Sequence, residues 1–362
     1  MFVVHFAEYA SGGVATYIRL LINNQANDSE IKKIVLVISD KNSEDFYFDS
    51  EKVVVERYKY SRGFVGLFVL VMQLFKIGKL KPSIVHLHST FAGLSRIMLF
   101  LVERNYQVIY CAHGWAFLNG NKISSFKNKL YITVEKLLLK VTDRVINISK
   151  YENDASVKLG FAKNKLILIR NSVQLVPSYN EVPRIFSGNG NKYIKLLFVG
   201  RLDTQKGIDI LIDAVKDDSK FVLSVIGDTV LNSNDTFENS QNIRFEGWKQ
   251  NKDVDSYIRQ SDAVIIPSRW EGFGLVALEA MRNKKAVVAS DSGALPDIVL
   301  DGQTGYVFKN GDVESLKKVL AKLSARELKS MGEAGYKRCV EFYNPDDMFQ
   351  SIKKLYKECL KR

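Results

Sequence analysis

The sequence predicts an α/β protein with two domains, each built on a doubly wound parallel sheet with helices on both faces. Short apolar runs of strand length alternate with helical runs along nearly the whole chain, which is typical of parallel sheets. The length of 362 residues exceeds what one hydrophobic core usually supports. Residues 174–193 interrupt the alternation with prolines, glycines, serines and asparagines, so we expect a linker there between domains at 1–173 and 194–344.

The elements of each domain are predicted from apolar runs and the turn residues that separate them. In the first domain, strands are expected at 2–6, 34–38, 53–55, 84–88, 108–111, 144–148 and 166–169. Helices are expected there near 14–26, 64–79, 91–104, 123–140 and 150–159. A second series of strands and helices runs from about 195 to 342, and a last helix is expected at 346–360.

The densest chemical signal is the run EGFGLVALE at residues 271–279. It places Glu271 before a turn made by Gly272 and Gly274, and it places Glu279 about a turn and a half into the following helix. Carboxylates accept hydrogen bonds from sugar hydroxyls, and N–H groups at a helix start hold phosphates. The pattern suits a sugar diphosphate. The alternative is an ordinary helix without a ligand, with one acid before its start and one on its solvated face.

Two more glycine turns follow predicted strands. Gly200 ends the strand run 195–199, and Arg201 and Lys206 then flank the turn into an apolar helix, where two cations fit a pyrophosphate. Near the N-terminus, Gly12 and Gly13 lead from a strand into another helix. A single glycine turn is weak evidence because many turns use glycine only for its positive φ. Three in one chain favour anion binding.

Several runs together resemble a retaining nucleotide-sugar glycosyltransferase of family four, within glycosyl transferases group 1. The runs are VGRLDTQKG at 199–207, PSRWEGFGLVALEAM at 267–281, ASDSGALPDIVLDGQTGYVF at 289–308, AHGW at 112–115 and the glycine pair at 12–13. The resemblance spans nearly the whole chain and implies the GT-B fold, in which two Rossmann-like domains face a central cleft. It departs from the family at Asp297, where Glu is common, and just after Asn171.

The resemblance implies transfer of a sugar from a nucleoside-diphosphate sugar, with UDP favoured as the carrier, to an acceptor hydroxyl with retention of configuration. The implied leaving-phosphate ligands are Arg201 and Lys206 with the backbone at Gly13, Gly272, Phe273, Gly274 and Leu275. Glu279 would bind the ribose, Glu271 the donor sugar, and His113 the donor sugar or the acceptor. Since cations would neutralise the phosphate, no metal ion or other cofactor is expected. The resemblance also implies that the last helix, within 345–362, packs back on the first domain.

Three further patterns have plainer interpretations. His86 and His88 share one face of a strand, which suits a metal, but no third ligand is expected nearby, so packing or acceptor contact is favoured. Asp253 and Asp255 form a D-x-D pattern at a helix start, where the helix dipole favours acids, so a structural role is expected. Trp248 follows a strand and either shelters the nucleobase or packs on the sheet edge.

The net charge of +12 lies mainly in the first half, because residues 1–172 carry 24 Lys and Arg against 14 Asp and Glu. No nucleic-acid-binding module is visible, so no nucleic-acid partner is expected. The uncharged run 63–75 precedes Lys76, Lys79 and Lys81. It is too short to span a bilayer but suits an anionic membrane surface. A helix buried against the sheet is the alternative.

Three cysteines without metal-ligand spacing indicate reduced thiols, and the N-terminal residues lack the pattern of a secretory signal. We therefore expect a cytoplasmic protein, peripheral on the inner face of the membrane. It would act on a glycan or lipid-linked acceptor in the synthesis of lipopolysaccharide or capsule. The alternatives are a nucleotide-sugar epimerase and a non-enzymatic protein that binds anions or nucleic acid.

Overall fold

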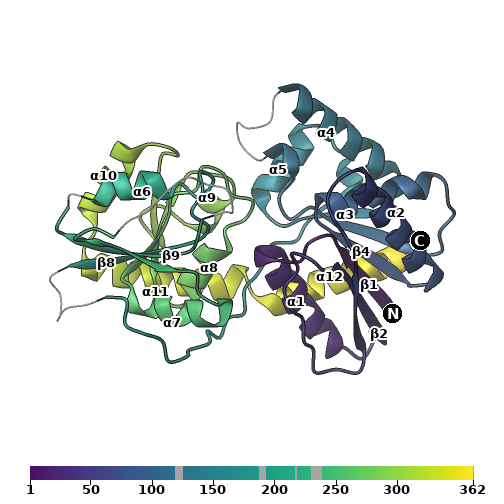
Figure 1. Cartoon of the computed structure of the whole chain (residues 1–362), viewed down its shortest axis with the longest axis horizontal. Coiled ribbons are helices and arrows are strands. Elements are labelled where there is room, and N and C mark those ends of the chain that lie inside the picture. Colours follow the sequence, from purple (N-terminus) through teal and green to yellow (C-terminus); the bar gives the residue numbers. More distant parts are fainter. Residues whose placement is uncertain (119–124, 187–192, 217, 230–238, 362) are drawn as a thin grey trace. The chain divides into compact units, whose positions relative to one another are not determined.

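The computed structural model describes residues 1–118, 125–186, 193–216, 218–229 and 239–361. The chain forms two compact units, one of Met1–Ser172 with Pro345–Arg362 and one of Val173–Asn344 (Figure 1). Each unit contains a parallel sheet covered by helices, which confirms the predicted fold class. Residues 174–186 of the predicted linker belong to the second unit, whereas Gly188 and Gly190 lie outside the described residues.

The first unit contains a sheet of seven strands in the order β3-β2-β1-β4-β5-β6-β7. The strands are β1 (Phe2–Ala7), β2 (Lys33–Ser39), β3 (Val53–Tyr58), β4 (Ile84–His88), β5 (Gln107–Cys111), β6 (Arg144–Asn147) and β7 (Leu166–Leu168). Its helices are α1 (Gly12–Ala26), α2 (Phe64–Lys79), α3 (Thr90–Leu94), α4 (Ser125–Leu138), α5 (Lys150–Lys158) and α12 (Pro345–Leu360), with short 3₁₀ turns η1 (Ser95–Phe100), η2 (Ala116–Leu118), η4 (Leu139–Val141) and η5 (Lys163–Lys165). The strand order reverses between β1 and β4.

Successive side chains of β1 and β4 point to opposite faces of the sheet, and the two faces carry different kinds of side chain. Val4 and Phe6 of β1 pack in one hydrophobic cluster with Leu70 and Leu74 of α2. The intervening His5 faces the other side, where its ring lies beside His86 of β4. That second face is covered by α1 and α12, which contact each other. The face therefore carries polar side chains that are buried under two helices.

The prediction of one α-helix over 91–104 is wrong. The chain forms the short helix α3 and then the 3₁₀ turn η1, which ends at Phe100. The Ser95 hydroxyl donates to the carbonyl of Ala92 at 2.6 Å, and Arg96 Nε donates to the carbonyl of Gly93 at 2.6 Å. Side chains that donate to nearby backbone carbonyls compete with the backbone N–H groups that would form the α-helical hydrogen bonds. The helix therefore tightens into a 3₁₀ turn.

Helix α2 carries two apolar stripes. Leu70, Leu74 and Ile77 are buried against the sheet, whereas Val65 is 75% exposed and Phe68 is 65% exposed. One side of the helix packs in the core, as the alternative of a helix buried against the sheet predicted. The other side remains exposed. Among the residues that the structure describes, no helix is long and apolar enough to cross a bilayer.

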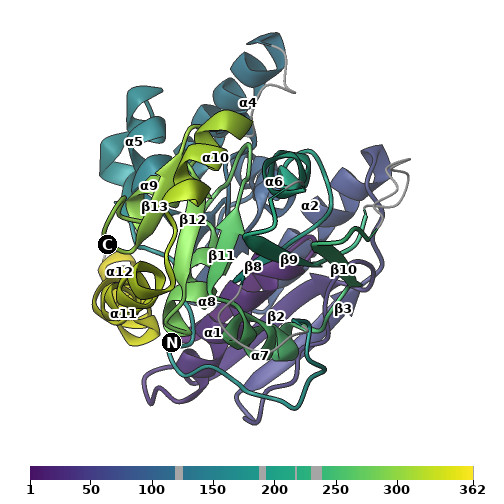
Figure 2. The ribbon, with the colours of Figure 1, turned by 90° about the vertical axis from the view of Figure 1, so that its left-hand side faces the viewer.

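The second unit contains a sheet of six strands in the order β10-β9-β8-β11-β12-β13, seen with its helices in Figure 2. The strands are β8 (Ile194–Val199), β9 (Phe221–Ile226), β10 (Ile243–Gly247), β11 (Ala263–Ile266), β12 (Ala286–Ser290) and β13 (Gly305–Phe308). The helices are α6 (Ile208–Val215), α7 (Val254–Gln260), α8 (Leu275–Arg282), α9 (Leu295–Ile298), α10 (Val313–Lys322) and α11 (Ala325–Phe342), with the 3₁₀ turn η6 (Asn251–Asp253). Helices α6 and α10 cover one face, and α7, α8 and α11 cover the other. The strand order reverses between β8 and β11, and the carboxyl ends at such a point are where open α/β sheets bind ligands.

Candidate active site

The turn between β8 and α6 carries the two predicted phosphate ligands, and they have different surroundings. Arg201 is half exposed in its side chain, and its guanidinium pairs with Asp203 at 3.0 Å and with Gln205 Oε1 at 2.6 Å. Lys206 is anchored through its backbone N–H, which donates to Asp203 Oδ1 at 2.9 Å. Asp203 thus fixes the turn from which Lys206 projects.

The loop after β11 brings Glu271 to Lys206. Lys206 Nζ lies 2.6 Å from Glu271 Oε2, and the Ser268 hydroxyl lies 3.3 Å from the same oxygen. The side chains of Lys206 and Glu271 are only 21% and 13% exposed. Two residues that are 65 positions apart therefore form a half-buried ion pair where the sheet reverses its strand order.

Close backbone approaches hold these loops in place. Gly207 has φ +65, and a Cβ there would lie 2.1 Å from the carbonyl oxygen of Pro267. Gly293 has φ +57, and a Cβ there would lie 1.8 Å from the carbonyl oxygen of Glu271. Only glycine tolerates both the conformation and the contact. These two glycines let the loops after β8, β11 and β12 stack directly on one another.

Helix α8 starts beside Glu271 at Gly274, which adopts φ +102. Within the described residues, no side chain caps this start and no acid lies in its first turn, which opens with Leu275. A helix start without these groups presents N–H dipoles that favour an anion. Phe273, by contrast, is buried and packs edge-on against Tyr343, so only its backbone can serve a ligand. Gly272 lies in the same turn.

Glu279 lies about a turn into α8 and is half buried. Burial raises its pKa, Asp255 raises it further, and Arg282 and Lys206 act in the opposite direction. The second predicted carboxylate therefore belongs to the helix that begins beside the Lys206–Glu271 pair. Lys206, Glu271, Glu279 and the start of α8 thus form one cluster, which we call the carboxylate–lysine site.

The D-x-D pattern has structural partners. Asp255 is buried, and its carboxylate accepts two bonds from Arg282, at 3.0 and 2.8 Å, and one from Asn283 at 2.6 Å. It also accepts the backbone N–H of Ser178, which ties the segment after residue 173 to α7. Trp248 follows the edge strand β10 and is 63% exposed, so much of its side chain is open to solvent.

In the first unit, strained backbone gathers at the carboxyl ends of neighbouring strands. Ser89 after β4 has φ +74, and His113 after β5 has φ +54. Such conformations are costly for residues with a side chain and are typical of functional sites. Gly12 and Gly13 lie in the first turn of α1, after the adjacent strand β1, and the N–H of Gly12 donates to Glu44. The predicted ligand Gly13 is exposed there.

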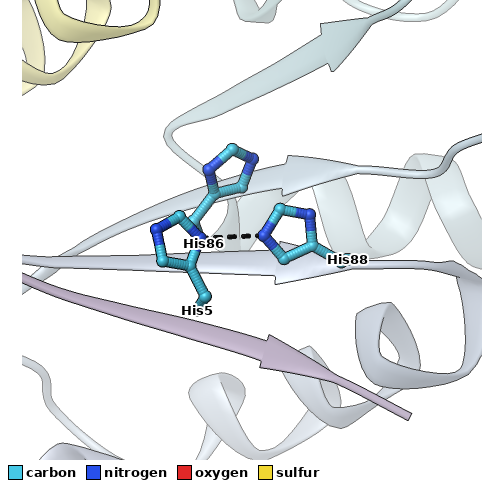
Figure 3. Close-up of side chains that lie close together, drawn as sticks. All are labelled: His5, His86 and His88. Carbon is cyan, nitrogen blue, oxygen red and sulfur yellow. Dashed lines mark hydrogen bonds between the residues drawn. The ribbon is translucent and has the colours of Figure 1, made fainter. Parts of the chain in front are cut away.

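All four histidines of the chain lie side by side, and three of them are joined by hydrogen bonds. His88 Nδ1 lies 2.9 Å from His113 Nε2, and His88 Nε2 lies 3.0 Å from His5 Nδ1. His86 stacks on His88 with ring centroids 4.2 Å apart (Figure 3). The expectation that His86 and His88 lack a third metal-ligand candidate is therefore wrong, because β1 pairs with β4 in a register that sets His5 against His86. The other ring nitrogen of His113 faces Cys111 Sγ at 3.7 Å, so both of its nitrogens have partners inside the unit.

Glu152 supports the His113 loop and predicts a pH effect. Its buried carboxylate accepts the backbone N–H of Ile148 at 3.0 Å and also faces those of Gly114 and Trp115. Burial raises its pKa to about 7, against about 4.5 in the unfolded chain. Its stabilising effect is fully present below pH 4.5 and is lost as the pH rises through 7.

We expect Glu152→Gln to remove this part of the pH dependence. Urea unfolding of both proteins from pH 4.5 to 8 should show the free energy of unfolding of the wild type falling relative to the variant. The difference is on the order of 3 kcal/mol. Titration of other groups is common to the two proteins and cancels in this comparison. Parallel curves would contradict the role given to Glu152.

Comparison with known proteins decides the family. Residues 11–176 match the family model described as Glycosyltransferase Family 4, and residues 183–338 match the model described as Glycosyl transferases group 1. An uncharacterized glycosyltransferase of Methanocaldococcus jannaschii is 30% identical over 96% of this chain and 95% of its own. The chain belongs to glycosyltransferase family four.

Two more relatives match this glycosyltransferase over nearly their whole length. An uncharacterized 41.2 kDa protein in the cps region of Klebsiella pneumoniae is 33% identical, with 99% of each chain covered. The capsular polysaccharide biosynthesis glycosyltransferase CapM of Staphylococcus aureus is 26% identical, with 90% of each chain covered. The family resemblance thus extends over the whole length of such proteins.

Solved structures agree on the GT-B fold of the glycosyltransferase. Sucrose-phosphate synthase from Thermosynechococcus elongatus has a TM-score of 0.80 at 20% identity, with 99% of both chains covered. Anabaena HepE in complex with UDP has a TM-score of 0.76 at 16% identity, covering 99% of this chain and 100% of its own. At these identities the likeness concerns the fold.

Some residues of the glycosyltransferase's site were not predicted from its sequence. Ser268 and Asp203 hold Glu271 and Lys206, but their types are common in any loop. His5 was missed although it stands in the middle of an apolar strand, FVVHFA, as His86 does in IVHLH. The signal that could have found His5 was a histidine inside each of two apolar strands, β1 and β4, between which the strand order reverses.

Proposed function

We propose that this glycosyltransferase transfers a sugar from a nucleoside-diphosphate sugar, with retention, to a hydroxyl of a glycan or lipid-linked acceptor in surface polysaccharide synthesis. The observation that carries the proposal is the pair of Lys206 and Glu271 beside the uncapped start of α8. In this cluster a cation and helix N–H groups suit the diphosphate, and carboxylates suit the sugar and ribose hydroxyls. The capsule-region relative and CapM support the pathway class.

The negative charge that develops on the departing phosphate is the main electrostatic problem of this reaction. Lys206 is fixed from its backbone by Asp203 and from its side chain by Glu271, so its charge is oriented before the donor binds. Arg201, more exposed, would exchange its partners Asp203 and Gln205 for phosphate oxygens. In this proposal protein cations, rather than a metal ion, neutralise the leaving group.

Glu271 is better suited to binding than to covalent attack. Its Oε2 already accepts from Lys206 and from Ser268, so this oxygen is held in hydrogen bonds and would have to leave them to attack a sugar carbon. Retention then follows if the leaving phosphate takes the acceptor proton on the face from which it departs. The contact predicted for His113 stays a prediction, since its ring nitrogens would have to leave His88 and Cys111 to meet a sugar.

A nucleotide-sugar panel tests the proposed donor site. We expect at least one nucleoside diphosphate, UDP first, to raise the melting temperature in the presence of EDTA. Saturation at 100 times Kd adds about 2.7 kcal/mol to the stability of the native state. The choice of UDP is supported by the HepE complex, whose fold this chain shares. A flat panel would refute the site, and conversion of the free donor without an acceptor would indicate an epimerase.

We also propose that the first unit rests on the anionic inner face of a membrane through α2 and η1. Both elements expose large apolar side chains, with Phe68 at 65%, Ile97 at 53% and Leu101, just after η1, at 88%. The two elements contact each other, so these exposed side chains come from neighbouring parts of the unit. Lys76 and Lys79, also exposed on α2, supply the matching positive charge. An amphipathic, basic surface of this kind suits an enzyme whose acceptor is anchored in lipid.

Vesicle flotation tests this surface. Replacing Lys76, Lys79 and Lys81 by Gln should weaken binding to vesicles that contain phosphatidylserine by about 100-fold, at about 1 kcal/mol for each charge. The matched control removes three exposed lysines from α10 instead, at positions 317, 318 and 322, and should bind like the wild type. Equal flotation of the two triple variants would refute the membrane proposal.

A further inference from the structure

His5, His86 and His88 are arranged as the ligands of a metal ion are, and the sugar transfer proposed above gives none of them a role. All three are fully buried, and one ring nitrogen from each lies within 4.8 Å of those of the other two (Figure 3). They come from the adjacent strands β1 and β4, whose pairing is regular throughout. The position of the ligand atoms is therefore fixed by the sheet itself.

The outward nitrogen of each ring already has a partner. His5 Nε2 lies 2.8 Å from Gln25 Oε1, His86 Nδ1 lies 2.7 Å from the Tyr356 hydroxyl, and His88 Nδ1 lies 2.9 Å from His113. This leaves His5 Nδ1, His86 Nε2 and His88 Nε2 as the three inward atoms. Histidine ligands of metals use their second nitrogen in this way, because the outer bond fixes the tautomer and the ring orientation.

A chain of hydrogen bonds alone does not account for the inner atoms. One proton between His5 Nδ1 and His88 Nε2 satisfies that pair at 3.0 Å. His86 Nε2 is then left buried with no hydrogen-bond partner among the described residues. A buried orphan nitrogen of this kind is costly, on the order of 1–3 kcal/mol. The hydroxyl of Tyr17, whose ring packs edge-on against His86 and His88, is a second buried polar group without a described partner.

We propose that His5, His86 and His88 bind a divalent transition-metal ion, best satisfied by Zn²⁺, with water as the fourth ligand. Imidazole nitrogens suit zinc at about 2.0–2.1 Å, and two ligands on a tetrahedron are then about 3.3 Å apart. The 3.0 Å separation of His5 Nδ1 and His88 Nε2 is close to that value. The three ligand atoms lie within 4.8 Å of one another, so the wider separations would shorten when an ion binds.

The proposed ion has a structural role. Through the outer partners it links β1 and β4 to α1 at Gln25, to α12 at Tyr356 and to the loop after β5 at His113. The C-terminal helix α12, whose Lys353 pairs with Asp28 at 2.6 Å, would thereby be fixed at Tyr356 as well. The site is independent of the diphosphate chemistry proposed for the second unit, and its test does not use activity.

Metal content of tag-free protein tests the proposal. The chain has four histidines, all in this array, so a histidine tag must be absent. Protein unfolded in guanidinium with EDTA, then refolded with ZnCl₂ or CoCl₂ and dialysed, should retain one ion per chain and melt at a higher temperature than metal-free protein. The cobalt form should show the intense visible absorption of a four-coordinate site. Absence of retained metal and of these bands in the wild type would overturn the proposal.

Two His→Asn variants distinguish a proposed metal ligand from a residue that only hydrogen-bonds to a ligand. His86→Asn should lose the bound ion and the cobalt bands. His113→Asn removes only an outer partner, so it should retain one ion per chain with an affinity about 10–100-fold weaker. Circular dichroism checks the fold of each, and a His86→Asn variant that fails to fold leaves the decision with the wild-type spectrum. Metal binding by folded His86→Asn that equals that of the wild type would contradict the assignment of His86.

Discussion

Lys206→Ala is expected to lower kcat/KM for sugar transfer by about 1000-fold, which corresponds to about 4 kcal/mol of transition-state stabilisation. The reason is the position of Nζ, 2.6 Å from Glu271 Oε2 beside the start of α8. A fixed cation there acts on charge that grows as the phosphate departs, so kcat should fall more than KM rises. Steady-state kinetics with the donor identified by the binding panel measures this split.

The variant also leaves the Glu271 carboxylate without its cation in a half-buried place, which lowers stability for a reason unrelated to catalysis. The double variant Lys206→Ala with Glu271→Gln removes that charge, so it should recover much of the lost melting temperature but none of the activity. Lys317→Ala is the matched control, because Lys317 pairs with Glu314 on an exposed helix. A Lys206→Ala enzyme with full activity would refute the role of this lysine.

Gly293→Ala is expected to be among the most damaging single-methyl changes in the second unit. The new Cβ would lie 1.8 Å from the carbonyl oxygen of Glu271, and φ +57 is itself unfavourable for alanine. We expect the free energy of unfolding to fall by about 4 kcal/mol, at the upper end of single substitutions. Because relief of the clash moves the Glu271 loop, kcat/KM should fall by at least about 100-fold.

Gly311→Ala separates conformational strain from the collision. Gly311 has φ +76, but a Cβ there meets no atom within 4 Å. This variant should lose only about 1 kcal/mol and keep its activity. Denaturant unfolding and transfer assays on both variants make the comparison. Equal losses in the two would show that the contact with Glu271 is unimportant.

The sequence predicted individual elements well where pattern and turn chemistry agree. Helix α2 spans Phe64–Lys79 as expected, and β4 spans Ile84–His88, because an uninterrupted apolar run and a strand between turn residues leave little choice. The helix at 91–104 failed because Ser95 and Arg96 bond to nearby carbonyls, an effect that apolar periodicity does not report.

The contacts within the sites depend on strand order, which local patterns do not contain. Glu271 meets Lys206 because β11 lies next to β8, although β9 and β10 come between them in the chain. His5 meets His86 because β4 lies next to β1, with β2 and β3 intervening. Lys206, Glu271 and His86 were singled out from the sequence and His5 was not, whereas all of their partners followed only from the topology of the sheets.

Calorimetric titration with a matched pair of nucleotides tests the central claim, that Lys206 recognises the outer phosphate of the leaving group. The nucleoside diphosphate selected by the panel and its monophosphate are titrated, with EDTA present, into the wild type and into Lys206→Ala. We predict that the wild type binds the diphosphate more tightly by at least about tenfold, or 1.4 kcal/mol, and that the variant loses this difference while still binding the monophosphate. A variant that keeps the full preference for the diphosphate would contradict the account.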